Sequence, residues 1–155
     1  MEKVMKKLSA LLFVLLFAVA LAAQDQPAEA TFTKSNKIKI KVTTISLEKY
    51  GPMKADKTFK AGETVYINME LRGLQANDQN QVVVQADLNI PALTLDRKNL
   101  IDGSTDYEEA VPMYFQIPIA SVQKGGFCNV KVVLRDMVAQ TYTEFTTSFK
   151  LSAEK

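Results

Sequence analysis

The sequence has no histidine and no tryptophan, and Cys128 is the only cysteine among its 155 residues. Without histidine the chain lacks the usual general base, every histidine-containing metal site, and the Ser/His and Cys/His pairs of common hydrolases. A single cysteine cannot form an intramolecular disulfide, so the fold must be stabilised by packing. These absences argue against most catalytic classes. We therefore expect a protein that is not an enzyme and that holds no cofactor.

Residues 1–23 have the layout of a secretory signal peptide. Lys3, Lys6 and Lys7 precede an apolar run over residues 10–23, with Ala20-Leu21-Ala22 or Leu21-Ala22-Ala23 as the candidate cleavage site. The alternative is a retained membrane helix, but residues 8–23 number 16, whereas a membrane span needs about 20 apolar residues. No cysteine lies at the cleavage site, which argues against lipid attachment there. We expect a periplasmic or secreted protein with no membrane span after cleavage.

The remaining chain is predicted to consist of a flexible leader, residues 24–36, and one domain, residues 37–152. Of the 19 basic and 17 acidic residues of the chain, three and one lie in the signal peptide, which leaves 16 of each. This balance gives no basic field for nucleic acid, so no nucleic-acid partner is expected. The charges are segregated, however. Residues 34–60 carry eight lysines against two acids, and residues 78–109 carry seven acids against two basic residues. These blocks either attract a charged partner or are two solvated faces of the domain.

Apolar residues recur with a period of two along most of this domain, which is typical of half-buried strands. The first segment, residues 37–47, alternates Lys with Ile or Val, and its phase changes at residues 43–45, which predicts a β-bulge. Lysines on the outward positions are typical of a sheet edge. Pro112 and Pro118 cannot donate to a strand ladder, so residues 111–117 are expected to be short or to lie at an edge. The predicted strands cover residues 37–47, 65–71, 82–90, 93–100, 111–117, 126–136 and 140–151.

The last two segments predict a long hairpin over residues 124–151, in which Cys128, Val130, Val132 and Leu134 form an apolar row. No segment after residue 23 has helical periodicity. About seven short strands separated by turn signals predict an antiparallel β-sandwich.

Two motifs resemble those of immunoglobulin-like and fibronectin-like modules. Residues 126–136, Gly-Phe-Cys-Asn-Val-Lys-Val-Val-Leu-Arg-Asp, resemble the G-x-Y-x-V-x-V-x-V-x-D run that enters the last hairpin of such modules, including many bacterial extracytoplasmic ones. Residues 59–65, Phe-Lys-Ala-Gly-Glu-Thr-Val, resemble their F-x-x-G-[DE]-x-V lead into the second strand. The resemblance implies an immunoglobulin-like β-sandwich, and it says nothing specific about function. Phe127 replaces the usual Tyr, so a packed corner is expected, and the expected core residues of the hairpin are Phe127, Val130, Val132, Phe145 and Phe149.

Residues 99–109 read as the longest polar loop, and they hold a weak calcium candidate. Asp102, Ser104 and Asp106 have the alternating oxygen spacing that can wrap a hard cation, and Glu108 or Glu109 could complete the shell. The sixth position of an EF-hand loop requires Gly, but Tyr107 follows Asp106 here. We therefore expect no metal site, with calcium at these residues as the alternative.

Tyrosines are the ligand-binding candidates. Tyr66 and Tyr114 lie on the faces of their strands opposite the apolar rows, and Tyr107 lies in the acidic loop. Exposed tyrosines on a sheet face commonly anchor protein or glycan ligands. The other interpretation is that these rings cover the edge of the core.

Two further groups invite a chemical reading. Asp87, Asp96, Asp102 and Asp106 could supply the carboxylate pair of a glycosidase. Cys128 could be a reactive thiol, but it heads an apolar row and has no histidine to activate it, which favours a place in the core.

The sequence thus favours an exported, non-catalytic binding or accessory module for another envelope or extracellular protein. A glycan-binding module is the alternative, and a carboxylate-based hydrolase is the second alternative.

Overall fold

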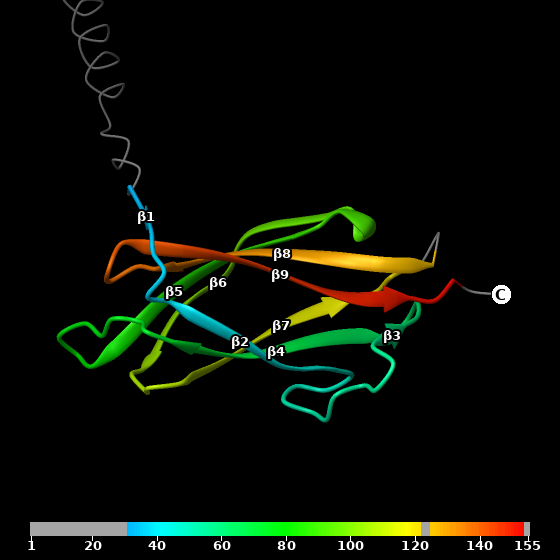
Figure 1. The fold of residues 1–155 in the computed structure, drawn as a ribbon, viewed down its shortest axis with the longest axis horizontal. Helices are drawn as coiled ribbons and strands as arrows, with labels where there is room; N and C mark the ends of the chain where they lie inside the picture. Colours follow the sequence, from blue (N-terminus) through cyan, green and yellow to red (C-terminus); the bar gives the residue numbers. More distant parts are fainter. Residues whose placement is uncertain (1–30, 122–124, 154–155) are drawn as a thin grey trace, which may run out of the picture. The chain divides into compact units, whose positions relative to one another are not determined.

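The computed structural model describes residues 31–121 and 125–153. The predicted signal peptide and residues 24–30 of the predicted leader lie outside the described residues. The described chain is all-β: it contains nine strands and one short 3₁₀ turn, Pro91–Leu93, arranged in two sheets (Figure 1). Within these ranges no helix has the length and apolar character that crossing a membrane requires.

The smaller sheet has three antiparallel strands in the order β2-β4-β7. Their bounds are Lys39–Ser46 for β2, Thr64–Arg72 for β4 and Val111–Pro118 for β7. The register of β2 shifts between Val42 and Thr44, which confirms the predicted bulge. The strand with two prolines, β7, lies at an edge of this sheet, as predicted.

The larger sheet has six strands, of which five follow the order β1-β9-β8-β5-β6. The long strands are Gln81–Ile90 (β5), Leu95–Asp106 (β6), Gly126–Asp136 (β8) and Thr141–Leu151 (β9). Two short strands, Thr33–Lys34 (β1) and Thr58–Phe59 (β3), pair in parallel with β9. The larger sheet is therefore mixed, whereas a purely antiparallel sandwich was predicted, and it includes Thr33 and Lys34 of the predicted flexible leader.

The two sheets enclose one apolar core, as expected for a sandwich. The inward rows of β4, β5, β7 and β8 supply most of it, and Phe59 and Phe149 meet edge to face with ring centroids 5.5 Å apart. Fully buried residues of large volume include Phe59, Ile67, Leu71, Leu88, Ile90, Phe115, Ile117, Leu134 and Phe149.

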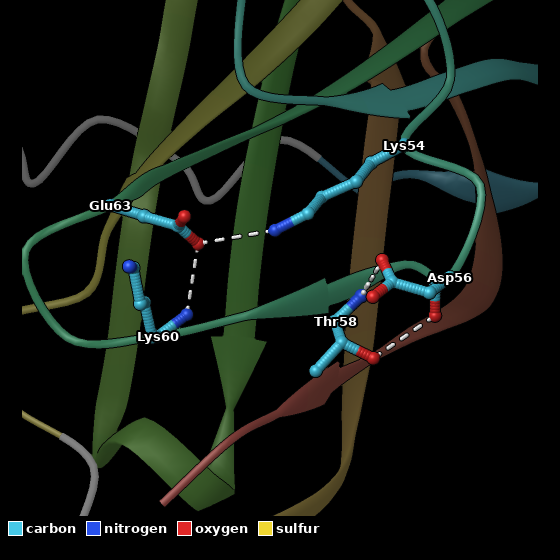
Figure 2. A network of polar contacts seen from close by, with 5 residues as sticks. All are labelled: Lys54, Asp56, Thr58, Lys60 and Glu63. Carbon is cyan, nitrogen blue, oxygen red and sulfur yellow. Dashed lines mark hydrogen bonds and ion pairs between the residues drawn. The ribbon is translucent and has the colours of Figure 1, made fainter. Parts of the chain in front are cut away.

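The turn before β4 explains why residues 59–65 have their motif (Figure 2). Phe59 is buried, and Gly62 adopts a φ of +83°, a conformation that favours glycine. The Glu63 carboxylate accepts a hydrogen bond of 2.9 Å from the Lys60 N–H and lies 3.4 Å from Lys54 Nζ. Each motif position thus has a structural role in entering β4.

The predicted hairpin is confirmed: β8 and β9 pair from Gly126↔Leu151 to Asp136↔Thr141. Cys128, Val130, Val132 and Phe149 are buried as expected, and Phe145 is partly buried against the core. The prediction for Phe127 is wrong, because its side chain is 71% exposed. Alternation along β8 turns this odd-numbered residue away from the even-numbered buried row. Its ring contacts solvent and the Lys150 ammonium, whose nitrogen lies 5.0 Å from the ring centroid.

The prediction of a polar loop over residues 99–109 is also wrong for most of its length, because β6 continues to Asp106. The strand has a bulge where the register with β5 shifts between Ala86 and Leu88, and Asn99 there adopts a φ of +51°. Most of β6 is solvent-exposed, so its sequence lacks the apolar row that identifies a strand.

Candidate functional site

The structure brings two of the three predicted tyrosines together. Tyr66 on β4 and Tyr114 on β7 lie on the outer face of the smaller sheet, with ring centroids 6.1 Å apart. Tyr50, which was not singled out as a ligand candidate, joins them at 5.7 Å from Tyr114 in an edge-to-face contact. Tyr107 is 43% exposed, its N–H donates to the Asn80 carbonyl, and no aromatic contact in the described ranges links it to the cluster.

A buried amide holds the loop that carries Tyr50. Asn68 is 1% exposed although it faces away from the core, and the backbone of Tyr50 lies against its side chain. Its Oδ1 accepts from the Tyr50 N–H at 2.9 Å, and its Nδ2 donates to the hydroxyls of Thr44 and Ser46 at 2.9 and 3.0 Å. Tyr50 is thereby fixed at a φ of +54°. This network holds the backbone of Tyr50 against β4, next to the other two tyrosines.

A lysine lies over the cluster. Lys49 Nζ is 4.6 Å from the ring centroid of Tyr114 and 5.4 Å from that of Tyr50. An ammonium in this position is attracted by the π-faces of the rings. The face of Tyr114 is thus partly occupied, while Tyr50 remains 51% exposed.

The four calcium candidates do not form a coordination shell. Asp102, Ser104 and Asp106 face outward from β6 opposite Gln85, Val83 and Gln81. Side chains two apart on a strand are separated by about 7 Å, whereas calcium ligands lie about 2.3–2.6 Å from the ion. Glu108 lies beyond the strand end, and no group of three or more acidic or cysteine side chains in residues 31–121 and 125–153 could hold a metal ion. The loop on which the calcium interpretation depended is absent.

Asp87, one of the glycosidase candidates, has a structural role. It is 6% exposed and lies opposite the β6 bulge, where Oδ1 accepts from the Asn99 N–H at 3.0 Å. Its Oδ2 accepts from Arg135 Nη2 at 2.7 Å, and Lys98 Nζ lies 3.7 Å away. The Arg135 hydrogen bond is the main cause that holds the pKa of Asp87 below its usual value, against the opposing effect of burial. This carboxylate is therefore kept ionised, which is the opposite of what a general acid requires.

Cys128 is buried at 0% exposure, and burial raises its pKa to about 11. Such a thiol has little thiolate at neutral pH and no access to a substrate. The interpretation of Cys128 as a core residue is confirmed.

A groove lies on the side where β6 and β7 are the outermost strands of their sheets. It has a volume of about 610 Å³ and is lined mainly by apolar groups. Val84, Met113 and Phe115 form its floor, and Leu100 and Pro112 lie at its rim. Tyr50 and Tyr114 also line it, so the groove adjoins the tyrosine cluster.

Gly103 keeps this groove open. It pairs with Val84 of β5, so its missing side chain would point inward between the sheets. A Cβ placed on Gly103 would meet no atom within 4 Å, and its φ is not positive. The glycine is therefore required neither by backbone conformation nor by close packing, and its effect is to leave space.

The β7 edge offers backbone groups to this groove. The Ile119 N–H donates to the Glu63 carbonyl across the sheet. The backbone N–H and C=O groups of the odd-numbered residues of β7 therefore point toward β4. The backbone groups of the even-numbered residues point toward the open edge, where Pro112 and Pro118 have no N–H to donate. Tyr114 and Gln116 lie between the two prolines and can still donate.

Comparisons with known proteins identify no family for this chain. No family model matches it, and no curated protein matches it. Among solved structures, it is similar to the alkylpurine DNA glycosylase AlkC of Pseudomonas fluorescens bound to DNA containing an abasic site analog, with a TM-score of 0.50 and 12% identity. That match covers 77% of this chain but only 31% of the glycosylase. At this identity the likeness concerns the fold alone.

A second solved structure is a conjugative transposon lipoprotein from Bacteroides eggerthii. The match has a TM-score of 0.37 and 13% identity, and it covers 76% of this chain and 99% of the lipoprotein.

Proposed function

We propose that this chain is an exported, non-catalytic immunoglobulin-like module that binds a segment of another protein chain along its open side. The observation that carries the proposal is the apolar groove of about 610 Å³ between two edge strands, β6 and β7. Apolar grooves next to unpaired strand edges can accept an added strand, in which main-chain hydrogen bonds give affinity and side-chain pockets give specificity.

The strand order supports the immunoglobulin-like assignment. Of the seven long strands, the first, second and fifth (β2, β4, β7) form one sheet, and the third, fourth, sixth and seventh (β5, β6, β8, β9) belong to the other. In constant-type immunoglobulin domains the fourth strand lies beside the fifth. Here β6 pairs with β5 instead, so no strand in the described ranges pairs with that side of β7. The open side of this domain is therefore the position that the fourth strand occupies in constant-type immunoglobulin domains.

The layout of residues 1–23 supports export, and the state of the candidate carboxylates supports a non-catalytic role. Asp87 is used in an ion pair, and Asp102 and Asp106 are exposed on the outer face of β6. The carboxylate-based hydrolase therefore stays a prediction.

The test is capture of a partner that depends on the groove. The exported protein, immobilised, is exposed to envelope proteins of its host beside two variants, Gly103→Val and Asn129→Val. Gly103→Val fills the groove from within, whereas Asn129→Val adds the same side chain at an exposed position of β8. We expect one partner to be retained by the wild type and by Asn129→Val and lost with Gly103→Val. Equal retention by all three would refute a role for the groove.

Glycan binding is the second candidate, favoured by the meeting of Tyr50, Tyr66 and Tyr114 on one face of the smaller sheet. Retardation of the protein by a soluble polysaccharide in a native gel, lost in Tyr114→Ala or Tyr66→Ala, would support it. Unchanged mobility in every polysaccharide tried, or retardation that both variants retain, would exclude the cluster as the site.

A further inference from the structure

Two edges of this domain carry opposite charges. On β2, Lys39 and Lys41 are exposed at alternate positions of an outermost strand. On β6, Asp102 and Asp106 are exposed at alternate positions of another, with Ser104 between them. No ion pair among residues 31–121 and 125–153 involves any of these lysines or aspartates. On the neighbouring strand β4, Lys39 lies opposite Arg72 and Lys41 opposite Glu70, so the sheet itself offers these lysines only one anion.

Both edges also leave apolar surface incompletely covered. Ile40 and Val42 of β2 contact the core but are only partly buried, and Ile101 of β6 is in the same state. Leu100, at the groove rim, is 42% exposed. A strand added to either edge would cover these side chains, and the alternation of β2 would place its lysines and its apolar residues on opposite faces of the joined sheet.

From these observations we propose that the occupant of the open side is a second copy of this chain, whose β2 strand pairs with β6. The inference rests on the proposed function, because it names the partner for the same side of the domain. Lys39 and Lys41 of one copy lie across from the row Asp102, Ser104 and Asp106 of the other. Ile40 and Val42 lie on the inner side, at the mouth of the groove.

The charges also determine which strand edges of two copies cannot pair with each other. Pairing of β2 with β2 would set lysines opposite lysines, and pairing of β6 with β6 would set aspartates opposite aspartates, and both are unfavourable. The contact therefore joins two different edges, so a pair of copies retains one free β6 edge and one free β2 edge, each on a different copy. Such a head-to-tail contact propagates into a chain of copies unless the rotation closes a ring.

Sedimentation of the exported protein at low and high salt tests this proposal. We expect the average mass to rise with protein concentration and to fall as salt screens the exposed charges. Lys39→Glu/Lys41→Glu and Asp102→Lys/Asp106→Lys should each weaken association by roughly tenfold or more, since like charges then face each other. An equimolar mixture of the two variants should regain it, because each reversed edge then meets a complementary one.

The control is Lys60→Glu/Lys131→Glu. It changes the net charge as Lys39→Glu/Lys41→Glu does, but at positions away from both edges, so it should associate like the wild type. A wild type that stays monomeric at low salt refutes the proposal, as does a mixture that fails to regain association. If the wild type is monomeric while capture of another protein still depends on Gly103, the inference fails and the proposed function stands.

Discussion

Replacement of Gly103, an exposed residue of the edge strand β6, by valine should stabilise the domain. The added carbons enter the groove between the sheets, where a Cβ would meet nothing within 4 Å. Each CH₂-sized group that is fully buried contributes about 0.8 kcal/mol. Because the groove is open to solvent, we count half of this for three carbons, about 1.2 kcal/mol. Removing a glycine from a strand interior adds roughly 0.5–1 kcal/mol by reducing the entropy of the unfolded chain.

The sum is about 2 kcal/mol in the free energy of unfolding. For a domain of this size about 1 kcal/mol corresponds to a shift of roughly 4 °C, so Tm should rise by about 8 °C. Calorimetry of the wild type, Gly103→Ala and Gly103→Val measures it. The alanine variant should give about half of the increase. It also reduces the backbone entropy of the unfolded chain, but it places only a single methyl group in the groove.

A lower Tm for Gly103→Val than for the wild type would refute the reasoning, because it would mean that the space at Gly103 is filled in solution. Asn129→Val on the exposed face of β8 should change stability by no more than about 0.5 kcal/mol, which separates groove filling from a general gain in strand propensity. The same measurement establishes that the variant used for partner capture is folded.

Three further results are expected. Because the pKa of Asp87 is lowered in the fold, its contribution to stability is present above its unfolded pKa and is lost as pH falls through the lower folded value. Arg135→Met should remove this acid-sensitive contribution and cost about 2–3 kcal/mol in urea unfolding at neutral pH, and unchanged stability would show that the pair is not buried in solution. Native Cys128 should react with iodoacetamide at least about a hundredfold more slowly than the denatured chain, and comparable rates would contradict its burial. Asn68→Leu removes the hydrogen bonds that hold the Tyr50 loop and should cost about 2–3 kcal/mol, whereas a cost below about 0.5 kcal/mol would mean that the loop is held by other contacts.

The features that the sequence predicted well depend on local alternation. The apolar rows of β4, β5, β7 and β8, the bulge in β2 and the closing hairpin all follow from the period of two and from its one change of phase. Two of the errors have local causes as well. The family resemblance predicts a buried Phe127, although the alternation of its own strand places it outside. Residues 99–106 lack the sequence pattern of a strand, because an exposed edge strand needs no apolar row.

The candidate site was less predictable, because it joins segments that are distant in sequence. Tyr66 and Tyr114 were singled out separately by their place opposite the apolar rows, but their contact follows from the register between β4 and β7. Tyr50 had no such signal, since its position depends on the Asn68 hydrogen bonds across a gap of 18 residues. Gly103 is a single glycine in a polar segment, and the sequence does not indicate that it lines a groove.

The sequence by itself determined that the chain is a β protein, which positions face its core, and that histidine-based chemistry is absent, because side-chain alternation and residue type are local properties. Only the tertiary structure decided which sheet each strand joins. The fourth long strand pairs with β5 rather than with β7, and this choice depends on contacts between segments far apart in the chain. It leaves two edges and an apolar groove open on one side of the domain, and that open side is where we place the function of this protein.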